Sequence, residues 1–300
     1  MKTTIIFVHT GNAYYLELAL AQAKISNPNA DIILLGDKSN NKYSYIKHYL
    51  ISDYFESARD FGEVYFNYSP NKEEYELFCF QRWFVINDFL IKHKITDTVL
   101  YCDTDTLLFH DISQHSNLFS KYWATIEKDG TPCFVFINLS NIKKFCEIVK
   151  KLYSTDSGKA IIQKYISYLK SNNKKYGISD MTAWKYFQTL YPDNVIYIDK
   201  PILDSSNDVI FCYDHNINCE DGFMYKNGKK EIQIINNIPY GIYNDGKKVM
   251  FCGLHFQGQA KLIMPQYYCG KMSVFTSIYW RCLINIIKQK IKNNIKYFLK

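Results

Sequence analysis

The chain has 300 residues, of which 47% are hydrophobic and 17% aromatic, and its formal net charge at pH 7 is +7. This length can bury a large core in one elaborated domain or in two small ones. The nine cysteines are odd in number and include no Cys-x-x-Cys pair, which argues against a zinc site and against a disulfide framework.

Membrane insertion is not expected from the hydropathy of the chain. No stretch contains 18 uninterrupted apolar residues, and the apolar run at residues 5–8 is too short for a signal peptide. The sequence therefore predicts a cytoplasmic protein.

The first 37 residues predict a strand, a helix and a second strand, at residues 3–8, 14–26 and 31–35. Ligands of open α/β sheets lie beyond the carboxyl ends of the strands, so the loop after the first strand is a candidate nucleotide pocket. An ordinary strand-to-helix loop explains the same pattern equally well. The loop residues expected to line the pocket are His9, Thr10 and Asn12.

A helical pattern at residues 73–93 turns Phe80, Phe84, Leu90 and Ile91 toward one face. It leads into residues 99–109, where an apolar strand ends on two carboxylates and a further apolar run follows. This strand carries Asp103 and Asp105, which the two-residue period of an extended chain turns to the same side. Paired carboxylates at a strand end suit Mg²⁺ or Mn²⁺, and such an ion can hold a diphosphate. An acidic turn that closes a strand is the alternative.

The middle of the chain predicts a strand at residues 133–137 and helices at residues 138–151 and 158–170. A further helix opens near Asp180, which occupies the position of an N-cap. Residues 201–250 alternate short apolar runs with Gly, Asn and Asp turns, a pattern typical of hairpins, and we expect them to shape an acceptor cleft.

A second polar motif, His-x-x-Gly-x-x-Lys, lies at residues 255–261. The imidazole of His255 could complete a metal site, Gly258 permits close approach of the backbone to a phosphate, and Lys261 could neutralise its charge. Alone, His255 would be read as a half-buried structural histidine. Together with the aspartate pair, it predicts a third metal ligand.

The C-terminal residues from 280 to 300 form a basic segment with six cationic side chains and no acidic one, without which the net charge would be about +1. If it is helical, Ile284, Ile287, Ile291 and Ile295 form one stripe beside lysines. This pattern predicts peripheral binding to an anionic membrane surface through residues 281–300. Packing of the helix on the protein's own core is the alternative. Nucleic-acid binding is not expected, because the rest of the chain has no basic stripe.

The order of these motifs resembles glycosyltransferases of the GT-A fold, in particular the family of glycogenin and the bacterial lipooligosaccharide galactosyltransferases, or a neighbouring family of bacterial polysaccharide transferases. The resemblance implies that Mn²⁺ or Mg²⁺ is held by Asp103, Asp105 and His255. It implies contacts to a nucleotide sugar from Arg82, Gly258 and Lys261, and a catalytic, sugar-facing role for Asp180. A solvated surface arginine is the alternative for Arg82. The chain departs from the first family at Leu262 and Ile263, where that family has Pro-Trp.

The resemblance implies an α/β fold of the GT-A type, with a Rossmann-like mixed sheet flanked by helices. The residue patterns add a hairpin-rich acceptor region and a C-terminal basic amphipathic helix. One catalytic domain would span residues 1–270, with a nucleotide and metal half (1–110) and an acceptor half (111–270), followed by a tail (271–300). The implied activity is metal-dependent transfer of a hexose from a nucleotide sugar to a glycan or lipid-linked glycan, as in bacterial surface polysaccharide synthesis.

Other readings of the aspartate pair are a phosphatase, a nucleotidyltransferase or a non-catalytic relative. Phosphatases that use such a pair place it near the start of the domain, and sugar nucleotidyltransferases open with a Gly-rich, Arg-bearing loop that residues 9–15 lack.

Overall fold

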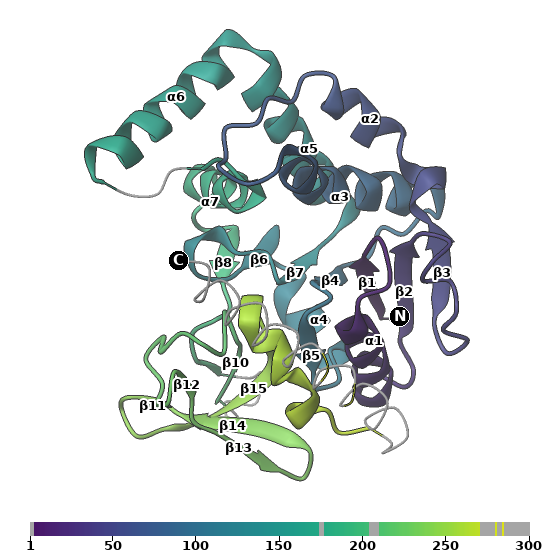
Figure 1. Cartoon of the computed structure of the whole chain (residues 1–300), viewed down its shortest axis with the longest axis vertical. Helices are drawn as coiled ribbons and strands as arrows, with labels where there is room; N and C mark the ends of the chain where they lie inside the picture. The colour runs from purple at the N-terminus through teal and green to yellow at the C-terminus, as the bar shows by residue number, and fades with distance from the viewer. Residues whose placement is uncertain (1–2, 174–176, 204–209, 271–279, 281–283, 285–300) are drawn as a thin grey trace, which may run out of the picture.

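The computed structural model describes residues 3–173, 177–203 and 210–270, together with residues 280 and 284. A seven-stranded sheet with the order β3-β2-β1-β4-β7-β6-β8 crosses the middle of the molecule (Figure 1). Its strands are β1 (Thr4–Val8), β2 (Asp31–Gly36), β3 (Lys47–Leu50), β4 (Val99–Cys102), β6 (Ala124–Ile126), β7 (Phe134–Ile137) and β8 (Val195–Tyr197). Strands β1 to β4 run parallel, whereas β7 pairs antiparallel with both β4 and β6. The fold is therefore the expected mixed α/β sheet.

Helices cover both faces of this sheet because its inner strands are apolar on both sides. In β1 the side chains of Ile5 and Phe7 enter one core, and those of Ile6 and Val8 enter the other. In Figure 1, helices α2, α3, α5, α6 and α7 lie on one side of the sheet, and α1, α4 and a second sheet lie on the other. These helices are α1 (Tyr14–Ser26), α2 (Glu56–Gly62), α3 (Glu73–Lys92), α4 (Ser113–Phe119), α5 (Leu139–Ser154), α6 (Asp156–Ser171) and α7 (Asp180–Leu190).

The predicted strand–helix–strand start is confirmed as β1, α1 and β2. The predicted long helix before the strand that leads to Asp103 is confirmed as α3. Helix α3 opens with an acidic first turn, which suits the positive end of the helix dipole. It buries Phe80 and Phe84 as its periodicity predicts, but Ile91, expected on the same face, is 50% exposed. The prediction for Ile91 was wrong because it extended the buried stripe into the last turn.

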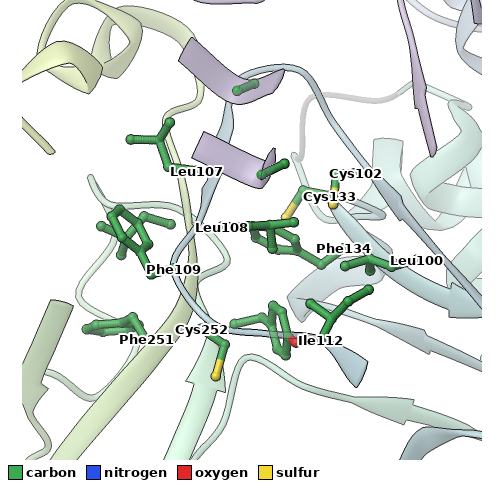
Figure 2. Packing of buried hydrophobic residues seen from close by; sticks show 14 of the residues in the cluster. Leu100, Cys102, Leu107, Leu108, Phe109, Ile112, Cys133, Phe134, Phe251 and Cys252 are labelled. Carbon is green, nitrogen blue, oxygen red and sulfur yellow. The ribbon is translucent and has the colours of Figure 1, made fainter. Parts of the chain in front are cut away.

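The strand that leads to the aspartate pair ends there as predicted, and the apolar run after the pair belongs to a second sheet. Strand β4 ends at Cys102, residues 103–105 turn, and β5 (Thr106–Leu108) leaves the central sheet to pair with β15 (Lys248–His255). Figure 2 shows the apolar residues that surround this crossing, including Leu107, Leu108 and Phe134. Gly253 of β15 permits the close approach of β15 to β7 of the central sheet, because a Cβ there would lie 2.5 Å from the Phe134 ring.

The second sheet confirms the predicted run of hairpins and has the order β13-β14-β15-β10-β9, with β5 added to β15. Its other strands, with the separate β11–β12 pair, are β9 (Ile202–Leu203), β10 (Ile210–Tyr213), β11 (Tyr225–Lys226), β12 (Lys229–Lys230), β13 (Ile232–Ile235) and β14 (Ile238–Ile242). Short 3₁₀ turns complete the fold: η1 (Ile51–Tyr54), η2 (Lys128–Gly130), η3 (Gly258–Leu262) and η4 (Met264–Tyr267).

Among the described residues, no helix is long and apolar enough to cross a membrane. The predicted amphipathic tail falls almost entirely outside the described residues.

Candidate active site

Three side chains that could hold a metal ion meet where the two sheets join. Asp103 and Asp105 lie in the turn between β4 and β5, residues 103–105, which we call the metal turn because of its candidate ligands. His255 is the last residue of β15. One ligand atom from each lies within 4.8 Å of the other two. Backbone hydrogen bonds hold the turn, since Asp103 N–H donates to Cys133 (3.0 Å) and the carbonyl of Asp105 accepts from Phe256 N–H (2.9 Å). The structure therefore brings together the two motifs that the sequence analysis paired.

The imidazole of His255 is oriented for ligation. Its Nδ1 lies 2.6 Å from the carbonyl oxygen of His215, which accepts its hydrogen, so the Nε2 lone pair is left for a ligand. Nε2 lies 3.5 Å from Oδ1 of Asp105. Burial alone would lower the pKa of His255, but the neighbouring Asp105 carboxylate outweighs it and raises the pKa to about 9. Without a metal, His255 is thus a cation paired with Asp105.

Lys261 adds a second positive charge on the other oxygen of the same carboxylate. Its Nζ lies 2.5 Å from Oδ2 of Asp105 and 5.3 Å from the centre of the Tyr15 ring. Burial would raise the pKa of the half-buried Asp105, but His255 and Lys261 hold it well below the ordinary value. A negatively charged ligand at this position would compete with Asp105 for Lys261.

Arg82 links the metal turn to α7. Its guanidinium donates to Asp103 Oδ1 (2.6 Å), to Asp180 Oδ2 (2.5 Å) and to the Tyr101 hydroxyl (2.7 Å). The side chain is only 12% exposed, so its alternative reading as a solvated surface arginine was wrong. Burial raises the pKa of Asp103, and the neighbouring Arg82 offsets part of that rise.

Asp180 lies at the start of α7 but is not its N-cap. The cap is Ser179, which forms a capping box with Thr182, so the predicted capping role of Asp180 was wrong. The buried Asp180 carboxylate instead accepts hydrogen bonds from Arg82 and from Trp83 Nε1 (3.0 Å), both on Oδ2. The helix start thus aims this carboxylate at the metal turn.

The loop after β1 adjoins the same turn. His9 Nδ1 lies 2.9 Å from the hydroxyl of Thr104, between the two aspartates, and burial lowers the pKa of His9. The Asn40 amide donates to the carbonyls of His9 and Gly11, both at 2.9 Å. The side chains of two other predicted pocket residues, Thr10 and Asn12, are exposed. Only His9 of the three reaches the metal turn through a side-chain hydrogen bond.

Gly258 lies inside the second motif and is the first residue of η3. Its φ of +61° lies in the left-handed region that favours glycine, and no atom lies within 4 Å of the position a Cβ would take. The backbone here is open to a ligand.

Several residues of this site were missed by sequence reasoning. Tyr101 donates its hydroxyl hydrogen to Asp103, and its position two residues before Asp103 on one strand could have indicated it. No sequence pattern indicated the contacts of three further residues, Trp83, His215 and Asp37. The carboxylate of Asp37 accepts a hydrogen bond from Gly11 N–H (2.5 Å).

No protein-family model and no curated protein sequence matches the chain. Solved structures do. Mouse xyloside xylosyltransferase 1 in its apo form aligns with a TM-score of 0.50 at 9% identity, over 66% of this chain and 86% of that one. The bifunctional glycosyltransferase WbbM aligns with a TM-score of 0.49 at 10% identity, over 93% of this chain and 51% of that one. The galactosyltransferase LgtC, with donor and acceptor sugar analogues, aligns with a TM-score of 0.36 at 15% identity, over 65% and 73%. The chain has a GT-A fold, as the sequence resemblance implied.

Proposed function

We propose that the protein is a metal-dependent glycosyltransferase that moves a hexose from a nucleotide sugar to a glycan or lipid-linked glycan, in bacterial surface polysaccharide synthesis. The observation that carries the proposal is the grouping of Asp103, Asp105 and His255 beside Lys261 at the carboxyl end of β4. In an α/β sheet this is the edge at which ligands bind.

The donor set fits a divalent cation. Two carboxylates supply hard oxygen ligands, and the Nδ1 hydrogen bond of His255 leaves its Nε2 for the metal. A set of mixed oxygen and nitrogen ligands favours Mn²⁺ over Mg²⁺, which prefers oxygen alone. When bound, such an ion neutralises the charge of a diphosphate leaving group.

Individual side chains are assigned to stabilising the leaving group and to binding the donor. In the reaction, the bond between the anomeric carbon and the diphosphate oxygen breaks, and its electron pair stays on the diphosphate. Lys261 would stabilise that charge, while an acceptor hydroxyl bonds to the anomeric carbon and its proton passes to the departing diphosphate. We assign the base of the donor nucleotide to the loop at His9, Thr10 and Asn12, and the diphosphate also to the open backbone of Gly258. Asp180, held by Arg82 on Oδ2, is assigned to a hydroxyl of the donor sugar through its other oxygen.

The proposed function is tested by incubating the purified protein with UDP-, GDP- and CMP-sugars in Mn²⁺, in Mg²⁺ and in EDTA. Release of a nucleoside diphosphate from at least one UDP- or GDP-sugar, or of a nucleoside monophosphate from a CMP-sugar, in metal but not in EDTA supports it. If no sugar nucleotide binds or is consumed, the protein is not a transferase of this class.

Replacing Lys261 by Ala should lower kcat by roughly 10²–10³-fold, the range found when one donor to a developing negative charge is removed. His255→Ala should instead weaken Mn²⁺ and donor binding together, as measured by calorimetry. Lys247→Ala is the matched control, because Lys247 pairs with Asp245 on the surface. Normal turnover and normal donor binding in both site variants would show that the second motif is structural.

We also propose that residues 1–270 form the catalytic domain and that residues 281–300 bind the membrane surface. Deleting residues 281–300 should leave donor hydrolysis near normal and abolish sedimentation with vesicles of phosphatidylglycerol and phosphatidylcholine. Binding of the intact protein should weaken as salt rises, because its lysines attract anionic lipid. Undiminished sedimentation after the deletion would refute the anchor, and loss of folding would assign the segment to the core.

A further inference from the structure

A cavity of about 720 Å³, in the size range of small-molecule sites, lies near the ends of β6 and β8, at the edge of the central sheet where β4 also ends before Asp103. Its wall comes from η2, from α7, from the end of β8, from the loop at residues 219–222 and from Tyr243. Gly130 brings two of these elements together, because a Cβ there would lie 2.3 Å from the Met181 carbonyl oxygen of α7.

Two short connections join the cavity to the metal ligands. On one side, Asp221 of the cavity wall lies 3.5 Å from Nδ1 of His215, whose carbonyl oxygen holds His255. On the other side, Glu127 directly precedes the wall residue Lys128 and accepts hydrogen bonds from the N–H groups of Cys133 and Phe134, both at 3.0 Å. The carbonyl of Cys133 in turn holds Asp103. These connections tie the cavity wall to the candidate metal ligands, none of which lines the cavity itself.

Asp199 is the unusual residue of the cavity wall. It is only 6% exposed, and its Oδ1 has no hydrogen-bond partner within the described parts of the chain. Burial raises the pKa of Asp199. A buried acceptor without a partner is costly, and such groups in native proteins usually mark a missing ligand or water. A sugar hydroxyl is a donor of the required kind.

Most of the positive charge of the wall is already paired, which disfavours an anionic ligand. Lys128 is paired with Asp221 (3.1 Å), and Lys185 is paired with Asp129 (3.3 Å). The remaining charged wall residues are Lys200, Asp199 and Glu220. The wall thus holds four carboxylates and three lysines, two of which are paired, and Lys230 also contacts Asp221 from outside the wall. The other large side chains of the wall are Tyr197 and Tyr243, and aromatic rings suit the apolar face of a pyranose.

We propose that this cavity is the acceptor subsite and that it takes a neutral sugar, one hydroxyl of which donates a hydrogen bond to Asp199. The proposal rests on the proposed function, since it assigns an acceptor to the same active site. It names the acceptor class: an uncharged glycan end rather than a uronic acid, a sialic acid or a sugar phosphate.

Binding of neutral sugars can be tested without a donor. Saturation-transfer NMR is measured on the full chain with methyl β-glucoside, β-galactoside, α-mannoside and N-acetyl-β-glucosaminide, and with methyl β-glucuronide as the acidic probe. At least one neutral glycoside should bind, and the glucuronide should bind at least tenfold more weakly than the glucoside. No binding by any neutral glycoside, or equal binding of the glucuronide, would overturn the proposal.

Variants of Asp199 separate ligand binding from a structural role. Asp199→Leu should weaken binding of the neutral glycoside by about tenfold to a hundredfold, the range for a hydrogen bond to a charged group. Asp199→Asn, which keeps a carbonyl acceptor, should retain part of the affinity. Asp245→Asn, in an exposed turn outside the cavity, is the matched control. Because removing an unsatisfied buried carboxylate relieves a cost, the Tm of Asp199→Leu should stay level or rise.

Each outcome has one meaning. A lower Tm in Asp199→Leu with unchanged glycoside binding would make Asp199 structural and overturn the proposal. Glycoside binding that depends on Asp199, in a protein that consumes no sugar nucleotide, would retain a neutral-sugar site and refute the transferase instead.

Discussion

Asp105→Asn should abolish sugar transfer while leaving the fold intact, and Asp103→Asn should do the same. Both changes remove a metal-ligating charge, and the change at Asp105 also leaves His255 and Lys261 without their shared counter-charge. EDTA should silence the wild type, and added Mn²⁺ should restore it. The measurement is release of nucleoside diphosphate from the donor identified in the screen.

Thermal unfolding provides a second readout of the same metal site. A metal that binds only the folded protein stabilises it by about 2.7 kcal/mol at a hundred times its Kd. Mn²⁺ should therefore raise the Tm of the wild type and of the surface control Asp245→Asn, but not that of Asp105→Asn. Full activity of the wild type in EDTA would overturn the metal assignment, as would an unchanged Mn²⁺ effect in Asp105→Asn.

Lys230→Met should destabilise the protein by about 3–5 kcal/mol, the cost of leaving buried charges without their partner. Lys230 is only 1% exposed, and its ammonium contacts Asp214 at 2.7 Å and Asp221 at 2.9 Å. Asp214 also accepts from the backbone N–H of His255, so loss of the lysine should weaken metal binding as well. Denaturant unfolding and Mn²⁺ calorimetry measure the two effects.

The pH dependence of this stabilisation follows from the pKa values. Burial would lower the pKa of Lys230, but Asp214 and Asp221 outweigh it and raise the pKa above 10.5. The contribution of Lys230 is therefore complete below about pH 10.4 and declines as pH rises through the folded-state pKa. Lys226→Met, at an exposed position, should change stability by no more than about 0.5 kcal/mol. A loss of similar size in both variants would contradict the buried network.

Local pattern was sufficient for much of the fold. The strand–helix–strand start and helices α3, α5 and α6 follow from hydrophobic periodicity, which depends only on neighbouring residues. The same pattern could not show that residues 99–109 divide between two sheets. Both halves are apolar, and the division depends on pairing of β5 with β15, far along the chain.

For the candidate site as well, some features were predictable from local sequence and others were not. The residue types and spacings of the two motifs were enough to indicate metal and phosphate chemistry, because ligand chemistry belongs to the side chains themselves. What Arg82 and Asp180 contact could not be predicted, since they are 98 positions apart and meet only when α3 packs near α7.

By itself, the sequence determined which side chains could hold a divalent cation and which segments would form helices and strands. Only the tertiary structure decided that Asp180 pairs with Arg82 rather than capping its helix and that a buried Lys230 supports His255. It also decided that Asp199 lines a cavity with an oxygen, Oδ1, that has no hydrogen-bond partner among the described residues. The physical reason is the sequence separation over which each effect acts. Propensity and periodicity act over a few residues, whereas burial and ion pairing depend on which distant segments share one core.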